Sequence, residues 1–151
     1  MEKYGAGSIV VSDYDPSWPA LFAQERARIA QALAPFALAI EHVGSTAVPG
    51  LPSKPIIDLL VGVPNLEQAR QRCMTPLEAL GYICMPEYAS WLPRELFFRK
   101  GPPGPWTHHM HVMELSHPRW EALVVFRDYL RAHPEAARAY ADINRELAAS
   151  S

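Results

Sequence analysis

The chain has little of what marks secreted, membrane-spanning or nucleic-acid-binding proteins. Its 151 residues include only two cysteines, Cys73 and Cys84, which provide neither a disulfide framework nor a CxxC metal motif. The formal net charge of −2 gives no general basic field, so broad binding to nucleic acid is not expected. No window has the apolar length of a transmembrane helix, and the N-terminus lacks the apolar core of a signal peptide. We therefore expect a cytoplasmic protein with no membrane partner; its oligomeric state stays open.

The composition is that of an ordinary globular domain, with 49% hydrophobic and 20% charged residues. The fifteen prolines fall mainly between periodic segments and so mark the ends of elements. The sequence contains no internal repeat and no linker that would separate two units. It predicts a single domain over residues 1–151, with a core at about 9–148.

Hydrophobic periodicity predicts an α/β (α+β) fold, a mixed β-sheet flanked by α-helices. The expected helices run from Ser17 to about Leu33, from an Asn65 cap towards Leu80 with a break at Pro76, and onward from Pro118 and Pro134. The expected strands cover residues 9–12, 37–43, 56–63, 82–85, 95–100 and 107–115, the last two forming a hairpin. In the helix from Pro118, four residues are expected to face inward: Trp120, Leu123, Phe126 and Leu130. Arg127, Asp128 and Arg131 are expected to form a solvated face.

Asp58 is the first candidate for chemistry. The strand around it is apolar on both faces, as in a central strand of a covered sheet, and a charge buried there needs a partner. Such a carboxylate could bind a divalent metal or act in catalysis. The alternative is a structural aspartate that accepts hydrogen bonds from the adjacent proline-rich loop.

The loop before Asp58 has features of a phosphate site. Gly44 permits close backbone approach, the Ser45 hydroxyl can donate to a phosphate oxygen, and Lys54 can reach the same anion. A Gly-Ser pair also marks ordinary turns, and the spacing is not that of a Walker loop.

Two histidines form the third candidate. His109 and His111 share one face of their predicted strand, where two imidazoles can chelate a metal such as zinc. They could also bind phosphate, act as a general base, or be satisfied by polar neighbours. Farther back, Arg94 and Arg99 are candidate phosphate clamps, although Arg94 shares its strand face with Lys100 and Arg99 with Phe97. A solvated strand edge is the alternative for this basic group.

Four segments together resemble the GrpB family of small bacterial proteins. They are EHVGSTAVPGLPSKPIIDLLV at residues 41–61, ELFFRK at 95–100, HHMHV at 108–112 and FRDYLRAHPEAARAY at 126–140. The resemblance implies a nucleotidyltransferase-like fold, in which a Gly-Ser turn binds nucleotide phosphates and aspartates hold magnesium or manganese.

Carried over by position, Gly44 and Ser45 resemble the Gly-Ser element and Asp58 the first metal-binding carboxylate. A typical member of the nucleotidyltransferase superfamily has a second carboxylate two residues later, where this chain has Leu60, and a third that His109 or His111 would have to replace. The leading hypothesis is a metal-dependent enzyme that acts on a nucleotide or another phosphorylated small molecule, with Asp58 and His111 as catalytic residues. The alternative is a non-catalytic phosphate-binding module, linked by resemblance to coenzyme A metabolism.

Overall fold

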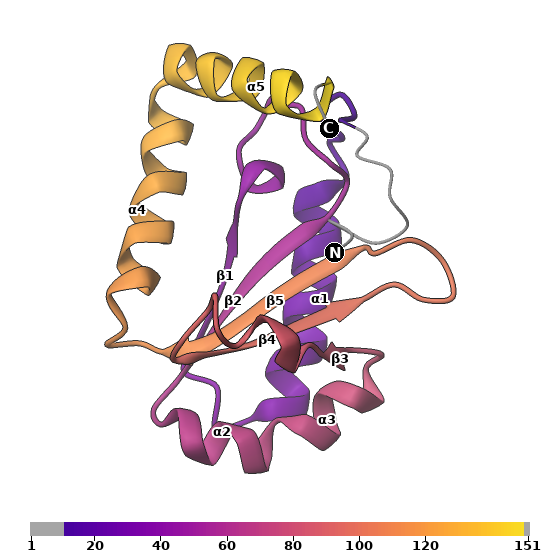
Figure 1. Cartoon of the computed structure of the whole chain (residues 1–151), viewed down its shortest axis with the longest axis vertical. Coiled ribbons are helices and arrows are strands. Elements are labelled where there is room, and N and C mark those ends of the chain that lie inside the picture. The colour runs from indigo at the N-terminus through magenta and orange to yellow at the C-terminus, as the bar shows by residue number, and fades with distance from the viewer. Residues whose placement is uncertain (1–10, 150–151) are drawn as a thin grey trace.

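The computed structural model describes residues 11–149, which form one five-stranded sheet with helices on both faces (Figure 1). The strand order is β1-β2-β5-β4-β3. The central pair, β2 and β5, is parallel, and the other three pairings are antiparallel. The strands are β1 (Ala39–Val43), β2 (Ile57–Val63), β3 (Ile83–Cys84), β4 (Glu95–Lys100) and β5 (His108–Glu114).

The helices begin and end close to the residues that the sequence predicts. They are α1 (Trp18–Leu33), α2 (Leu66–Arg72), α3 (Met74–Ala79), α4 (Pro118–Ala132) and α5 (Pro134–Ala149), with 3₁₀ turns η1 (Ser45–Ala47) and η2 (Pro86–Tyr88). The Asn65 side chain caps α2 by accepting from the Gln68 amide. The predicted break near Pro76 occurs at Cys73, which separates α2 from α3. This position suits Pro76, because a proline in the first turn of α3 loses no helical hydrogen bond.

The main core lies between the sheet and the helices α1, α2 and α3. It contains alternate residues of the central strands, among them Leu59, Val61, Met110 and Val112, packed against Ile29 and other helix residues. Buried Glu25 of α1 accepts hydrogen bonds from the Tyr82 hydroxyl at 2.6 Å and the Lys100 ammonium at 2.7 Å. Lys100 therefore points to the α1 side of the sheet, away from Arg99.

The opposite face of the sheet is only partly covered. At one end, α4 packs Trp120, Leu123 and Val124 onto a small cluster that includes Leu60. Figure 1 shows α5 crossing at the other end of the sheet, so α4 and α5 form two sides of a frame. This arrangement leaves Asp58 of β2 and His111 of β5 partly exposed between them.

Two expectations for α4 were wrong. Phe126 is 45% exposed and meets Tyr140 of α5 edge-on, because the inward face of α4 is occupied by its neighbours in sequence. Arg127 and Arg131 are not merely solvated. Arg127 donates to the Glu41 carboxylate at 2.6 Å and to the His42 carbonyl at 3.0 Å, and Arg131 donates to the Ala47 carbonyl at 2.8 Å.

The first expected strand, at residues 9–12, lies partly outside the described residues. Ser12 forms an isolated antiparallel bridge with Ser53. No helix within residues 11–149 has the length and apolar character needed to cross a membrane.

Candidate functional site

Three polar residues line up across the three central strands. Asp58 on β2 is the in-register partner of His109 on β5, and His109 is the partner of Arg99 on β4. Partners in register project to the same side of a sheet. The row therefore lies on the sheet face opposite α1, which we call the Asp58 face.

The Gly44–Ser45 turn adjoins this row at the end of β1. Val43 is the in-register partner of Asp58, so the chain leaves β1 beside the carboxylate. Gly44 has φ +75°, and a Cβ atom built on it would lie 2.5 Å from Asp58 Oδ2. Only glycine fits, because the backbone is left-handed and the side-chain space is already taken. The turn backbone thus runs directly against the carboxylate.

Buried Thr46 fixes the shape of the turn. Its hydroxyl donates to the Ile56 carbonyl at 3.2 Å, so it accepts from His42 Nε2, which lies 2.9 Å away. On the outer side, the Asn144 amide of α5 donates to the Ser45 hydroxyl at 3.5 Å. The turn is therefore held by β1 on one side and by α5 on the other.

The electrostatics of the row favour a carboxylate beside a neutral imidazole at neutral pH. Burial raises the pKa of Asp58 to about 6, opposed by the charges of His111 and Lys54. Burial lowers the pKa of His109 to about 3, and Arg99 adds to the effect. His109 Nδ1 lies 3.6 Å from Asp58 Oδ1, and the Asp58 side chain keeps 32% of its exposure. A ligand can therefore reach the carboxylate from the open side.

His111 is held by a carboxylate that the sequence analysis did not single out. Its Nδ1 lies 2.8 Å from Glu95 Oε1, and Glu95 Oε2 is 3.0 Å from Arg119 Nε. The Glu95 side chain is almost fully buried, and its pKa lies below the usual range because hydrogen bonding and charge from His111 and Arg119 outweigh desolvation. An ionised carboxylate only accepts, so the proton of neutral His111 sits on Nδ1 and Nε2 keeps its lone pair. Such a lone pair can bind a metal or take a proton.

Arg99 carries a buried positive charge among aromatic rings. Its guanidinium carbon lies 5.0 Å from the ring centres of Tyr88 and Trp106, and 5.6 Å from that of Phe97. One terminal nitrogen donates to the Tyr88 hydroxyl, and Nε has no hydrogen-bond partner among residues 11–149. Within residues 11–149, no carboxylate forms an ion pair with Arg99. A cation placed this way is a ready partner for an anionic ligand.

The two remaining basic candidates behave differently. Lys54 is close enough to the row to favour the charged form of Asp58. Arg94 is exposed and precedes β4, at the end of that strand opposite Arg99. The structure therefore brings together Gly44, Lys54, Asp58, Arg99, His109 and His111, with Ser45 on the adjoining turn. It does not bring Arg94 to them.

The donor set matches only part of a two-metal site. Among residues 11–149, no three His, Cys, Asp or Glu side chains are arranged to hold a metal ion. Leu60 is fully buried in an apolar cluster with Val43 and Met113, so a carboxylate at that position would be buried among apolar side chains. Asp58 and His109 are spaced about as two ligands of one ion, which lie roughly 3.3 Å apart at tetrahedral Zn distances. A metal bound there would need further ligands from a phosphorylated molecule, since Mg²⁺ commonly uses one or two carboxylates plus substrate phosphates.

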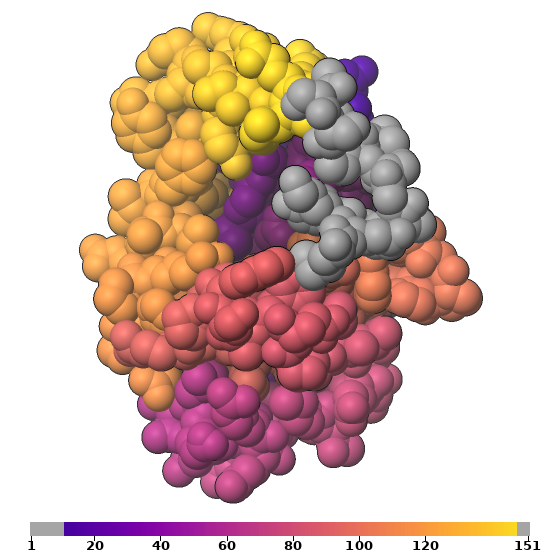
Figure 2. All heavy atoms as spheres, in the orientation of Figure 1, coloured from indigo at the N-terminus to yellow at the C-terminus, as the bar shows by residue number. Residues whose placement is uncertain are grey.

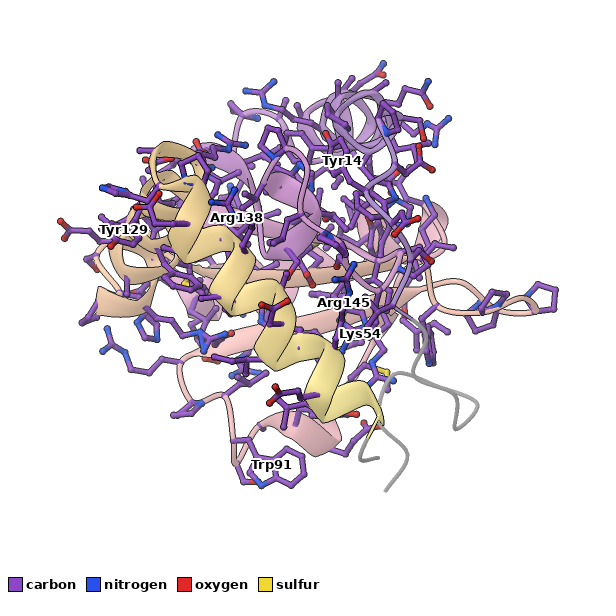
Figure 3. All side chains as sticks on the ribbon, turned by 90° about the horizontal axis from the view of Figure 1, so that it is seen from above. Tyr14, Lys54, Trp91, Tyr129, Arg138 and Arg145 are labelled. Carbon is purple, nitrogen blue, oxygen red and sulfur yellow. The ribbon has the colours of Figure 1, made fainter. Side chains whose placement is uncertain are left out.

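The space above the Asp58 face is open. Figure 2 shows a hollow between α5 and the segment around η2, with the chain from β1 towards β2 at its floor. Trp91, which is 64% exposed, projects from the η2 side, well away from α5 (Figure 3). Sequence reasoning missed Glu95, Tyr88, Arg119 and Asn144 as contributors to this region. Only Glu95 left a signal, as a carboxylate at the start of an otherwise apolar strand.

These features define a mixed α/β protein with a β-sheet flanked by α-helices, as the sequence predicted. The structure of Cid1 in complex with the UTP analogue UMPNPP shares the fold, with a TM-score of 0.51, 14% identity and coverage of 82% of this chain and 38% of that one. The chain belongs to the GrpB protein family, which it matches over residues 8–151. The crystal structure of the conserved protein GrpB from Enterococcus faecalis is 36% identical, with a TM-score of 0.84 over 93% of this chain and 84% of that one.

Relatives of longer length also match. The UPF0157 protein PA4798 of Pseudomonas aeruginosa is 47% identical over 93% of this chain, and the chain spans 57% of that relative's length. A protein named dephospho-CoA kinase from Mycolicibacterium paratuberculosis is 29% identical over 87% of this chain, which corresponds to 37% of that protein.

Proposed function

We propose that this protein is an enzyme that binds a nucleotide or another phosphorylated small molecule on the Asp58 face and transfers a phosphoryl or nucleotidyl group. The observation that carries the proposal is the row of Asp58, His109 and Arg99 beside the Gly44–Ser45 turn. The row joins a carboxylate, a neutral imidazole and a buried cation on one sheet face, where the Asp58 side chain is accessible to solvent.

Phosphate binding falls to the turn and the two cations. The backbone at Gly44 can approach an anion closely, and the Ser45 hydroxyl, which accepts from Asn144, keeps its own proton to donate. Lys54 and Arg99 supply positive charge from two sides. Arg99 is favoured over Arg94 because it is buried, next to the row and without a carboxylate partner within the described residues.

The proton chemistry falls to His111. In our proposal its Nε2 accepts the proton of the attacking hydroxyl while the oxygen–phosphorus bond forms and the bond to the leaving phosphate breaks. Glu95 stabilises the imidazolium that results, because its buried carboxylate already holds Nδ1–H at 2.8 Å. A divalent ion carried by the phosphates, held by Asp58 with His109, would neutralise charge on the transferred group.

Calorimetry with product analysis tests the proposal. ATP, CTP and dephospho-coenzyme A are titrated with and without Mg²⁺ or Mn²⁺ into the wild type, Asp58→Asn and His111→Gln, and the mixtures are followed by ³¹P NMR. We expect metal-dependent binding that Asp58→Asn weakens at least tenfold, and turnover that His111→Gln removes while binding persists. Ligand affinity that is the same with and without metal, and the same in Asp58→Asn as in the wild type, would refute the catalytic assignment.

A second candidate is a non-catalytic binding module. Leu60 favours it, because the position of the second carboxylate of typical nucleotidyltransferase superfamily members is filled by an apolar residue with no exposed surface. The similarity to a protein named dephospho-CoA kinase makes dephospho-coenzyme A the first ligand to try. Tight binding of a ligand that remains unchanged in the ³¹P spectrum, with every metal and acceptor tested, would select this function.

A further inference from the structure

A second basic region lies on the other side of α5 from the open sheet. Residues 49–52, which follow the η1 turn, face the end of α4 and one side of α5 across a groove of about 450 Å³. We call this the α5 groove. None of Ser45, Lys54, Asp58, Arg99, His109 or His111 lines it. Its volume is within the range of sites for small organic ligands.

The groove is rimmed by three arginines and one carboxylate. Arg131 comes from α4, Arg138 and Arg145 come from α5, and Asp142 is the acidic residue. In a chain with a net charge of −2, an excess of two positive charges in one groove is a strong local field. The groove therefore attracts anions although the whole protein does not.

The arginines have donors to spare. Arg131 uses Nε for the Ala47 carbonyl, which fixes its stem and leaves both terminal nitrogens. Its pKa lies below the usual range because of desolvation and the nearby Arg127 charge, so an added anion would relieve repulsion. Arg138 and Arg145 form no ion pair with any residue in the described part of the chain. They follow one another along α5 (Figure 3), two turns and about 10 Å apart by helix rise.

The floor of the groove is apolar and rigid. Leu51, Leu130, Ala137 and Ala141 are buried and pack together as one cluster. The small alanine side chains let a ligand approach the α5 backbone. A compact body on this floor can place separate negative groups at separate arginines, whereas a single small anion can engage only part of the rim.

We propose that the α5 groove binds a small molecule with two or more anionic groups, independently of the Asp58 face. The two sites share the turn between them, since Ala47 and Ser45 contact α4 and α5 respectively. The groove requires neither Asp58 nor a metal.

Titration of inorganic tripolyphosphate into metal-free full-length protein tests this site. The test variant is Arg138→Gln/Arg145→Gln, and its matched control is Arg70→Gln/Arg72→Gln, which removes the same charge from α2. We expect the first pair to weaken tripolyphosphate binding at least tenfold and the control pair to change it less than twofold. Asp58→Asn is expected to leave it unchanged, and orthophosphate is expected to bind at least tenfold more weakly.

Three results would overturn the proposal. Equal losses of tripolyphosphate affinity in the two double variants would mean that the anion binds through general positive charge and not in the α5 groove. A loss in Asp58→Asn with none in Arg138→Gln/Arg145→Gln would move the ligand to the Asp58 face. The absence of saturable tripolyphosphate binding to a wild type with a native thermal transition would exclude the site, whatever the outcome at the Asp58 face.

Discussion

The Asp58 carboxylate occupies the space that a side chain at residue 44 would need, with Oδ2 only 2.5 Å from the position of a Gly44 Cβ. The position of the Asp58 carboxylate therefore leaves no room for a side chain at residue 44. Gly50 offers a comparison, because its φ of +82° is also left-handed and its Cβ position is open.

We expect Gly44→Ala to lower the free energy of unfolding by about 2–4 kcal/mol, from backbone strain plus the clash with Asp58. Gly50→Ala should cost only the strain, about 1–2 kcal/mol. Urea unfolding of both variants gives the difference. If both variants lose the same free energy of unfolding, residue 44 and Asp58 are not in close contact.

Asp58→Asn is expected to make the protein more stable at neutral pH. The folded-state pKa of about 6 exceeds the ordinary 3.8, so the wild type loses stability as the pH rises from about 4 through 6. The variant escapes this loss and should gain about 1–3 kcal/mol over the wild type at pH 7 and almost nothing at pH 4. Thermal unfolding across this range checks the prediction. A variant that is less stable at pH 7 than at pH 4, relative to wild type, would contradict it.

Glu95→Gln should weaken the hydrogen bonding of His111. The neutral amide oxygen is a weaker acceptor than the carboxylate that now faces Nδ1, and Arg119 loses its ionic partner at 3.0 Å. We expect a loss of about 1–3 kcal/mol in unfolding free energy and a shift of the His111 ring-nitrogen signals in ¹⁵N NMR. Glu114→Gln is the control, because Glu114 accepts from the Leu66 amide and does not contact His111. Its ring spectrum should match the wild type.

Arg99→Met should separate stability from binding. Methionine fits among the rings of Tyr88, Phe97 and Trp106. The change also removes a buried charge that no described carboxylate balances, so the free energy of unfolding should fall by less than about 1 kcal/mol or rise. Binding of phosphorylated ligands should weaken at least tenfold. Arg94→Met, at an exposed position, is the comparison. If Arg94→Met weakens binding and Arg99→Met does not, the phosphate clamp is Arg94.

Much of the fold follows from local sequence. Periodicity and proline positions place the helices and strands. The proximity of the Gly-Ser turn to Asp58 can also be predicted, because the turn follows one strand and Asp58 lies on the next, with a single loop between them. The shared face of His109 and His111 also follows, because alternation on a strand depends only on spacing.

The rest depends on pairing between distant segments. Glu95 looks like a solvent-exposed end of β4 until the register sets it beside His111 and α4 supplies Arg119. Likewise, nothing in the spacing of α4 shows that Arg127 and Arg131 reach back to β1 and η1. Long side chains find partners that a helical wheel cannot display.

The parallel pairing of β2 with β5 has a consequence for how the protein folds. Asp58 meets His109 only after the chain between residues 58 and 109 has closed as a loop, and that closure carries an entropic cost before any contact repays it. The antiparallel pairs join strands that are near in sequence and can form locally. The row of functional residues instead spans the pairing of β2 with β5, which needs the longest loop to close. Variants that slow this closure should populate a collapsed chain that has near-native helices and does not bind ligand. The rate at which ligand binding returns after dilution from urea would therefore measure the last step of folding.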